Sequence, residues 1–352
     1  MSTDAQTANV PFLGRLRGLG VISAVGLGLV GLLLFWVVVN FVKFPADSTQ
    51  VLLIGITTGA VYALVALGYT LVYGILELIN FAHGDVFMLG GMISATFAVD
   101  VFGLGTGGGI GKWLLVLATL FISMALCGLI NTTVELIAYR PLRGAPRLVP
   151  LITAIGMSFI LQNVGLAWKG ANFVSVPNIL PHSQVFSIGG VTYTWNKLIV
   201  VFITVPVLAG LVYLVQSTKQ GKAMRATAQD MDAAAMMGIN VNRTISFTFL
   251  IAGMLAGAAG LLYALYVTNV RFDQGFQLGL IAFTAAVLGG VGNLPGAVLG
   301  AVCIGLVQAF NEGFNWHAPG SDWTQSIVFS VLILILVFRP EGLLGERTPE
   351  GA

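Results

Sequence analysis

TKQGKAMRATAQDMDAAAMMGIN, residues 218–240, is the longest polar, helix-forming stretch in a chain that is otherwise mostly apolar. Its five charged residues are Lys219, Lys222, Arg225, Asp230 and Asp232. Apolar runs at 197–217 and 244–267, each long enough to cross a bilayer, flank it on both sides. Because charged groups are costly in hydrocarbon, the stretch is expected to lie on a membrane face, where another molecule can dock on it.

Composition places the whole chain among polytopic membrane proteins. Hydrophobic residues make up 57% of its 352 residues and charged residues only 9%, whereas soluble proteins carry about 25% charged residues. No polar segment is long enough to form a soluble domain of ordinary size. Cys127 and Cys303 fall inside apolar runs and are interpreted as buried, reduced thiols.

Runs of about 20 apolar residues predict the membrane-spanning helices. Clear runs occur at 20–42, 51–73, 113–138, 148–168, 197–217, 244–267 and 324–338. A shorter run covers 86–102, and the long run 279–311 is interrupted by GGVGNLPG. Because glycine and proline favour a turn there, 279–311 is interpreted as two short helices. The predicted fold class is an all-α polytopic membrane protein with about ten transmembrane segments, some broken or short.

Lysine and arginine are distributed unevenly between the two sides of this arrangement. If the N-terminus is cytoplasmic, the cytoplasmic segments hold 11 of the 16 basic residues, namely Arg15, Arg17, Arg140, Arg143, Arg147, Lys219, Lys222, Arg225, Arg243, Arg339 and Arg347. This bias predicts that both termini are cytoplasmic. The expected organisation is a cytoplasmic segment 1–19, one transmembrane domain 20–338 with a polar loop at 218–243, and a cytoplasmic tail 339–352.

Two breaks interrupt the apolar pattern, at 74–85 and 288–296. Irregular backbone at membrane depth is tolerated only against protein or a water-filled path, and paired breaks in the two halves of a transporter often mark the solute path. The first break can equally be a cytoplasmic turn capped by Asn80 and Asp85, and a lone histidine such as His83 is more often a packing residue than a ligand. Helix–helix hydrogen bonding explains polar side chains within spans as well as path lining does. The candidate path residues are Tyr62, Tyr69, Asn80, His83, Asp85, Gln162, Asn163, Gly290, Gly292 and Asn293.

Catalytic and nucleotide-binding patterns are missing from the sequence. GTGGGIGKW, residues 105–113, departs from a phosphate-binding loop because Thr106 and Trp113 stand where that loop needs glycine and a hydroxyl residue. Hydrolase, protease and metal-site patterns are also absent. The ionisable residues in the spans lie near predicted helix ends, which gives ion coupling little support. They are Glu77, Asp85, Glu135 and Glu312. Energy for uphill transport is therefore expected from another chain.

The segment DAAAMMGI, residues 232–239, resembles the coupling-loop pattern of ABC importer permeases, in which Asp or Glu precedes two alanines and, after three residues, a glycine. The runs 62–92, 221–265 and 283–301 resemble branched-chain amino acid permeases of the LivH type. Glu77 departs from that likeness, because a small or neutral residue is expected there. Together these runs cover about a third of the chain.

This resemblance implies a helix at 221–238 that lies on the cytoplasmic face and inserts into a cleft of an ATPase subunit. The implied ATPase-coupling residues are Lys222, Arg225, Gln229, Asp230, Asp232, Ala233, Ala234 and Gly238. It also implies two ATPase subunits that bind ATP and Mg, a homologous but different second permease subunit, and a periplasmic or lipid-anchored binding protein. No cofactor, metal or nucleic acid is expected on this chain.

The function that the resemblance implies is that of a non-catalytic subunit in the bacterial inner membrane, surrounded by lipid. It would translocate branched-chain or related aliphatic amino acids with energy from the ATPases. Two alternatives remain open, namely a urea or short-amide permease of the same family, and a stand-alone channel or secondary carrier that needs no ATPase.

Overall fold

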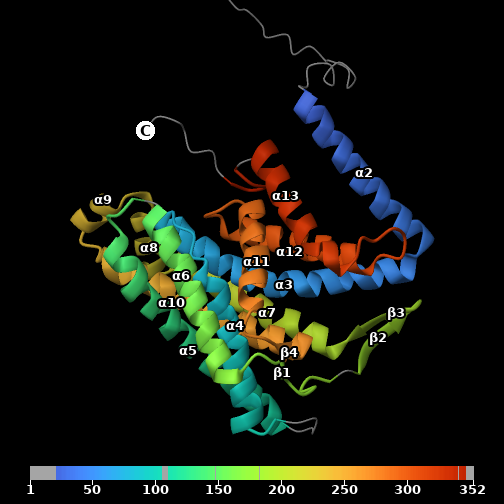
Figure 1. Ribbon diagram of the computed structural model, residues 1–352, viewed down its shortest axis with the longest axis horizontal. Coiled ribbons are helices and arrows are strands. Elements are labelled where there is room, and N and C mark those ends of the chain that lie inside the picture. Colours follow the sequence, from blue (N-terminus) through green and yellow to red (C-terminus); the bar gives the residue numbers. More distant parts are fainter. Residues whose placement is uncertain (1–20, 105–109, 147, 182, 340, 346–352) are drawn as a thin grey trace, which may run out of the picture.

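The computed structural model describes residues 21–104, 110–146, 148–181, 183–339 and 341–345, which form one bundle of helices (Figure 1). The expected segment 1–19 and most of the expected tail 339–352 lie outside the described residues. The first half contains α2 (Val21–Lys43), α3 (Pro45–Leu76), α4 (Ala82–Ala95), the π-helix η1 (Thr96–Val101), α5 (Ile110–Val134), the π-helix η2 (Glu135–Tyr139), the 3₁₀ turn η3 (Arg140–Leu142) and α6 (Leu148–Lys169).

The second half contains α7 (Trp195–Ser217), α8 (Lys219–Gln229), α9 (Met231–Met236), α10 (Val241–Val267), α11 (Gln274–Gly289), α12 (Leu294–Gly313), the 3₁₀ turn η4 (Ser321–Trp323) and α13 (Thr324–Phe338). Four short strands form two antiparallel pairs, β1 (Val174–Ser175) with β4 (Asn269–Val270) and β2 (Gln184–Ile188) with β3 (Val191–Thr194).

Among the described residues, eight helices are long and apolar enough to cross a membrane. Two shorter apolar helices, Val30–Lys43 and Gln274–Gly289, accompany them. The predicted all-α fold with about ten membrane segments is therefore confirmed. The long run 279–311 divides into α11 and α12, because Gly290 and Gly292 adopt the positive φ angles that a tight turn needs.

Helix ends gather on two opposite sides of the bundle. One side, called here the α8–α9 side, carries α8, α9 and the two breaks 77–81 and 290–293. The other, called here the strand side, carries the four strands and the link between α12 and α13 (Figure 1). Hydrogen bonds tie the strand side together, including Trp36 Nε1 to the Trp316 carbonyl at 3.0 Å. Each membrane helix begins on one of these sides and ends on the other, so consecutive helices alternate in direction.

Small residues allow the central helices to approach closely. A Cβ built on Gly84 of α4 would lie 2.8 Å from the Cα of Gly279 in α11, which is closer than real Cβ contacts. Membrane helices associate through such contacts because lipid supplies no hydrophobic force between them. The core consequently consists of α3, α4, α5, α10, α11 and α12, with α3 buried on nearly every side from Gly59 to Val72.

These six central helices repeat one arrangement in opposite directions. α3 packs against α12 as α10 packs against α5, and α4 packs against α10 as α11 packs against α3. The two leading helices, α3 and α10, both end in a non-glycine residue with left-handed backbone, Glu77 at φ 51° and Thr268 at φ 63°. Short helices, α4 and α11, follow these caps. Inverted repeats with broken helices are typical of transporters.

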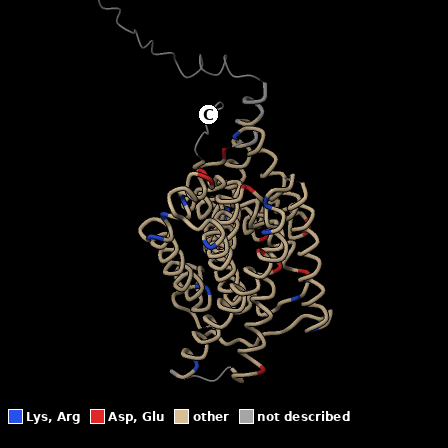
Figure 2. Tube along the Cα trace, turned by 90° about the vertical axis from the view of Figure 1, so that its left-hand side faces the viewer, with Lys and Arg blue, Asp and Glu red and all other residues tan. Residues whose placement is uncertain are grey.

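The outer helices α2, α6, α7 and α13 turn large apolar side chains outward, for example Phe202 on α7 and Ile333 on α13. Charged residues are sparse along the whole trace (Figure 2). α2 packs on α3 and α13 and stands away from the rest of the bundle (Figure 1). This distribution fits a bundle that is surrounded by lipid.

Candidate functional site

α8 lies flat against the bundle through one face. Its buried residues Gly221, Met224 and Thr227 recur every three positions, as one face of a helix requires. The Thr218 hydroxyl caps the helix by accepting a hydrogen bond from the Gly221 amide at 3.0 Å. A Cβ at Gly221 would collide with the carbonyl oxygens of Leu214 and Val215. Only glycine therefore lets α8 turn so sharply away from α7.

The polar stretch forms two helices where the sequence resemblance predicted one over 221–238. Asp230 interrupts it with extended backbone, at φ −157° and ψ 114°. Its carboxylate Oδ1 accepts hydrogen bonds from the amides of Asp232 at 2.8 Å and Ala233 at 2.9 Å. An aspartate that caps the amides following it favours the start of a new helix. The side chain of Asp230 is thus engaged in building α9.

The end of α9 is equally well defined. Gly238 adopts φ 84°, its amide bonds to the Ala235 carbonyl at 3.0 Å, and the Ile239 amide bonds to the Ala234 carbonyl at 3.0 Å. This pair of bonds is a Schellman motif, which ends a helix at a left-handed glycine. Asn240 then caps α10 by accepting a hydrogen bond from the Arg243 amide at 3.0 Å. Caps at both ends make α9 a short, well-ordered projection.

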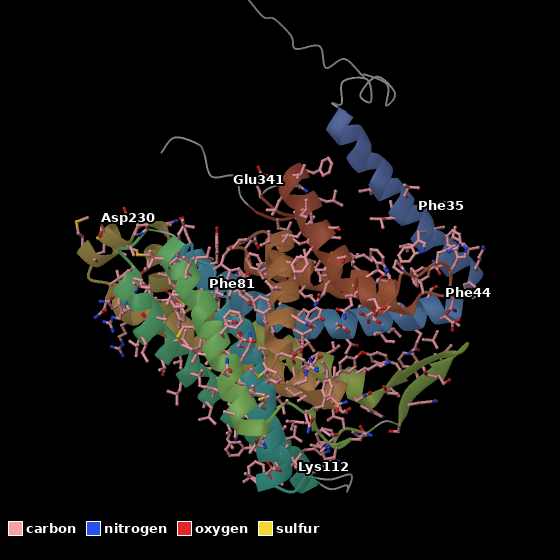
Figure 3. All side chains as sticks on the ribbon, in the orientation of Figure 1. Phe35, Phe44, Phe81, Lys112, Asp230 and Glu341 are labelled. Carbon is pink, nitrogen blue, oxygen red and sulfur yellow. The ribbon has the colours of Figure 1, made fainter. Side chains whose placement is uncertain are left out.

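The tip of this projection is apolar and open. Met236 and Met237 are 82% and 85% exposed, and Figure 3 shows Asp230 at the outer edge of the bundle. Flexible methionine side chains suit a surface that packs into a partner. The sequence resemblance did not single out these two residues, although the adjacent methionines in a polar stretch were a visible signal.

The predicted coupling residues do not all face outward. Lys222, Gln229, Asp232 and Gly238 are exposed, while Ala233 is half-buried and Ala234 is buried against the bundle. The exposed Arg225 donates a hydrogen bond to the Val215 carbonyl at the end of α7. A cation at the carbonyl end of a helix is favourable, so Arg225 ties α8 to α7.

The first break is held by buried side chains. Asn80 accepts a hydrogen bond from the Tyr139 hydroxyl at 2.9 Å and donates one to Asn131 Oδ1 at 3.4 Å. Asn131 in turn donates to the Phe249 carbonyl of α10 at 2.7 Å. The side-chain caps predicted from Asn80 and Asp85 are absent, because α4 begins after Phe81 without a side-chain cap. Phe81 lies within the bundle (Figure 3).

Asp85 and Gln162 are brought together through α6. The Ser158 hydroxyl donates to Asp85 Oδ2 at 2.5 Å, and Gln162 Nε2 donates to Ser158 Oγ at 3.1 Å. Asn163, the next residue, lies on the exposed face of α6 and donates a hydrogen bond to the carbonyl of Phe159 at 2.8 Å. Helical geometry turns adjacent residues about 100° apart, which separates these two amides.

Two tyrosines predicted for the path occupy different environments. Tyr69 packs edge-on against His83, with ring centroids 4.9 Å apart, and both side chains are buried. The His83 ring fills the space that a Cβ at Gly68 would occupy. Tyr62 donates to Gln308 Oε1 on α12 at 2.7 Å and belongs to a separate polar cluster.

The second break is a glycine turn. Gly290 and Gly292 have φ angles of 106° and 90°. Asn293 caps α12 by accepting a hydrogen bond from the Gly296 amide at 2.9 Å, and its Nδ2 donates to the Leu344 carbonyl at 2.7 Å. Leu344, which follows α13, therefore lies directly against this turn.

A cavity of about 580 Å³ lies on the α8–α9 side. Its wall combines the end of α3 at Gly74, the α8 residues Met224 and Arg225, and the second break at Gly292 and Asn293. The polar stretch and the second break therefore share one cavity. Within the described part of the chain, no group of three or more His, Cys, Asp or Glu side chains is arranged to hold a metal ion.

The strand side offers a different, structured surface. The β1–β4 pair joins the long link 170–194 to the connection between α10 and α11. Arg271 beside this pair donates to Asp273 Oδ1 at 2.5 Å and lies 5.0 Å from the Phe173 ring. The Asp273 carboxylate raises the pKa of Arg271, which stays charged at the surface.

Residues 51–337 match the family described as "Branched-chain amino acid transport system / permease component". The chain belongs to this permease family. It is 39% identical over 306 residues to the high-affinity branched-chain amino acid transport system permease protein BraD of Pseudomonas aeruginosa, a match that covers 86% of this chain and 97% of the relative. It is 36% identical over 304 residues to LivH of Escherichia coli K12, covering 84% and 95% of the two chains. Among solved structures, PsaBC from Streptococcus pneumoniae in complex with Fab aligns with a TM-score of 0.43 at 16% identity, covering 87% of this chain and 96% of that one.

The matched range of the permease begins inside α3 and ends one residue before the end of α13. It contains both breaks, α8, α9 and the six central helices except for the first turns of α3. α2 lies before it. The first break and the projection of α9 therefore belong to the part of the permease that defines its family, whereas Leu343 and Leu344, which bond to the second break, lie beyond it.

Proposed function

We propose that this permease is the transmembrane subunit of an ATP-driven importer for branched-chain or related aliphatic amino acids. The observation that carries the proposal is the projection of α9, which is capped at both ends and exposes Met236 and Met237. Its support is the shared family of BraD and LivH, whose names state high-affinity branched-chain amino acid transport.

In this proposal the α8–α9 side is cytoplasmic and both termini lie in the cytoplasm of a bacterial cell. Two ATPase subunits, which bind ATP and Mg, receive α8 and α9 of this chain and of a homologous second permease. A periplasmic or lipid-anchored binding protein delivers the amino acid to the strand side. The chain itself carries out no catalysis and holds no cofactor.

The same proposal assigns roles to particular residues. The exposed coupling residues contact the ATPase, while Arg225, Asp230 and Ala234 hold α8 and α9 in shape. The solute passes the region of the two breaks and of the hydrogen-bonded side chains Asp85, Ser158 and Gln162. The residues proposed to shape that path are Tyr69, Asn80, His83, Asp85, Gln162, Gly290, Gly292 and Asn293. Asn163 and Tyr62 are not assigned to the path, because Asn163 faces outward from α6 and Tyr62 bonds to Gln308 on α12.

Reconstitution of the permease with its second permease, ATPases and binding protein tests the transport function. We expect ATP-dependent uptake of leucine, isoleucine and valine into proteoliposomes. Uptake of urea or acetamide without uptake of leucine would support the amide alternative. Leucine uptake by the permease alone, without ATPases, would support a stand-alone carrier and overturn the proposal.

A charge placed on the tip of α9 tests the docking surface. The double variant Met236→Glu, Met237→Glu alters two open side chains and should leave the fold intact, because buried packing is unchanged. We expect the ATPase to stop co-purifying with it and ATP-driven uptake to fall at least about tenfold, since two charges must be desolvated on docking. Gln220→Glu, an exposed position on α8, is the matched control and should behave as wild type. Normal co-purification of the double variant would exclude the tip as the docking site.

A further inference from the structure

Three polar side chains form one buried stripe along the end of α5 and the following π-helix η2. Asn131, Glu135 and Tyr139 are spaced four residues apart, so they share a helix face. Asn131 and Glu135 are fully buried and Tyr139 is 1% exposed. Asn131 and Tyr139 bond to Asn80, and Glu135 bonds to Ser246 of α10, so the stripe joins elements that are distant in sequence.

One end of the stripe reaches the start of α10. The Glu135 carboxylate forms a salt bridge with Arg143, and its Oε2 accepts a hydrogen bond from Ser246 Oγ at 2.6 Å. Arg143 also donates from Nη1 to Asn242 Oδ1 at 2.5 Å. Asn242 lies two residues after Asn240, the cap that follows the Schellman turn of α9. This end of the stripe is therefore attached to the junction between α9 and α10.

The other end of the stripe reaches the first helix break. The Tyr139 hydroxyl donates to Asn80 Oδ1 at 2.9 Å, and Asn131 accepts from Asn80 Nδ2 at 3.4 Å. The Tyr139 ring also packs against Phe249, with centroids 5.4 Å apart. Asn80 thus has its amide oxygen bonded by η2 and its amide nitrogen bonded by α5. Two side-chain hydrogen bonds therefore join the first break to α5 and η2.

The composition of the stripe is unusual for a purely stabilising contact. Burying a carboxylate and several amides in an apolar bundle is costly, and well-packed apolar residues often stabilise as much or more. In addition, α5 changes from α to π geometry at Glu135–Tyr139, within the stripe. Short π segments inside helices frequently occur at functional sites.

We propose that the chain Asn242–Arg143–Glu135–Tyr139–Asn80, named here the polar ladder, positions the first helix break relative to the α9–α10 junction. Displacement of α9 by a bound ATPase then shifts Asn242, and the ladder carries that shift through the end of α5 to residues 77–81. Arg143 and Glu135 act as positioning residues that do not themselves contact solute. The transport part of this inference rests on the proposed function, whereas the mechanical link is a property of the permease alone.

Hydrogen–deuterium exchange of the purified permease in nanodiscs tests the mechanical link without any partner. Arg143→Gln removes the salt bridge, and we expect amide exchange in segment 77–88 to rise roughly tenfold as the break loses its anchor. Arg143→Lys keeps the charge next to Glu135 and should restore most of the protection. Arg140→Gln, an exposed arginine three residues earlier, is the matched control and should leave segment 77–88 unchanged.

A second variant keeps the test informative if Arg143→Gln does not accumulate in the membrane. Tyr139→Phe removes only the hydroxyl that reaches Asn80, so we expect faster exchange in 77–88 and unchanged exchange in 240–246. Wild-type exchange in 77–88 for both variants, with changes confined to 135–147, would overturn the ladder and leave Arg143 as a local brace.

The assembled transporter supplies the functional readout. With Arg143→Gln or Tyr139→Phe we expect ATP hydrolysis to continue while leucine taken up per ATP falls about fivefold, since part of the link between junction and break is lost. Arg143→Lys should recover most of this ratio. An unchanged ratio would overturn the role in transport. A wild-type assembly that fails to take up leucine would instead overturn the proposed function, and the exchange experiment would still decide the ladder.

Discussion

The break at 77–81 is held by side chains of another helix, whereas the break at 290–293 is held largely by backbone hydrogen bonds, with Asn293 as its one capping side chain. At the first, Asn80 is bonded by Tyr139 and Asn131, which come from another helix. At the second, the amides of Leu343 and Leu344 bond to the carbonyls of Leu288 and Gly289 at 2.8 and 3.0 Å. Both breaks interrupt apolar runs and face the α8–α9 side, yet different forces maintain them.

This difference bears on which break can respond to a partner. Side-chain hydrogen bonds can be lengthened or exchanged when the helix that carries them moves. A glycine turn with two left-handed residues and backbone bonds on either side has few alternative conformations. We therefore expect the first break to move during transport and the second to act as a rigid support, and the following variants test that contrast.

The largest effect is expected from Gly290→Val. Gly290 has φ 106°, and a Cβ there would lie 2.5 Å from the amide nitrogen of Gly345. Strained backbone and this collision together should destabilise the permease by at least about 3 kcal/mol. Thermal unfolding of the purified protein measures it, and Gly156→Val, in α6 with open space around the Cβ position, is the matched control. A wild-type unfolding midpoint for Gly290→Val would refute the description of a rigid turn.

Asn80→Ala should have the next largest effect. It leaves the buried Tyr139 hydroxyl and the Asn131 amide oxygen without their partner, at a cost of about 2 kcal/mol in the free energy of unfolding. If the two residues act through one hydrogen bond, Asn80→Ala should cost clearly less in a Tyr139→Phe background. Chemical denaturation of the two single variants and the double variant measures this coupling. Strict additivity would contradict a break held by this hydrogen bond.

A smaller effect is expected from Asn293→Ala. This change removes the cap of α12 and the bond to the Leu344 carbonyl, and loss of a cap costs about 1 kcal/mol. Asn293→Asp keeps the accepting oxygen and should recover the capping part of that loss. Limited proteolysis of the tail, together with thermal unfolding, separates the two contributions. Equal behaviour of the alanine and aspartate variants would show that the cap contributes nothing.

Gly74→Ala should have the smallest effect, at the point where the two breaks approach each other. A Cβ at Gly74 would lie 3.6 Å from the Cα of Gly292, which is ordinary van der Waals contact. Because alanine favours helix, we expect unchanged or slightly increased stability, by less than about 1 kcal/mol. A marked loss of stability or of transport would mean that the breaks press on each other, and the contrast between them would need revision.

Local features of this chain follow from neighbouring residues and are predictable from sequence. Ten apolar segments, the split of 279–311 and the position of the polar stretch all depend on residues close together in the chain. The division of that stretch at Asp230 also has a local cause, a carboxylate that caps the two amides after it. The resemblance implied one helix over 221–238 and did not take the cap at Asp230 into account.

Contacts between distant residues were not predictable in the same way. Gln162 and Asn163 look equivalent in the sequence, yet Gln162 lies near Asp85 while Asn163 faces outward. Glu135 and Arg143 were noted only as an ionisable residue near a helix end and as one of the basic residues. Their partnership depends on how α5, α6 and α10 pack.

The sequence by itself determined that this protein spans a membrane about ten times, where its helices break and which stretch stays outside the lipid. These features depend on the free energy of transfer of each segment, which its own residues set. Only the tertiary structure decided that the buried Asn80, Tyr139 and Glu135 join the half-buried Arg143 and the exposed Asn242 in one polar ladder. Its members lie in segments separated by up to 162 positions between Asn80 and Asn242, and close packing at glycine-lined helix faces determines which of them meet.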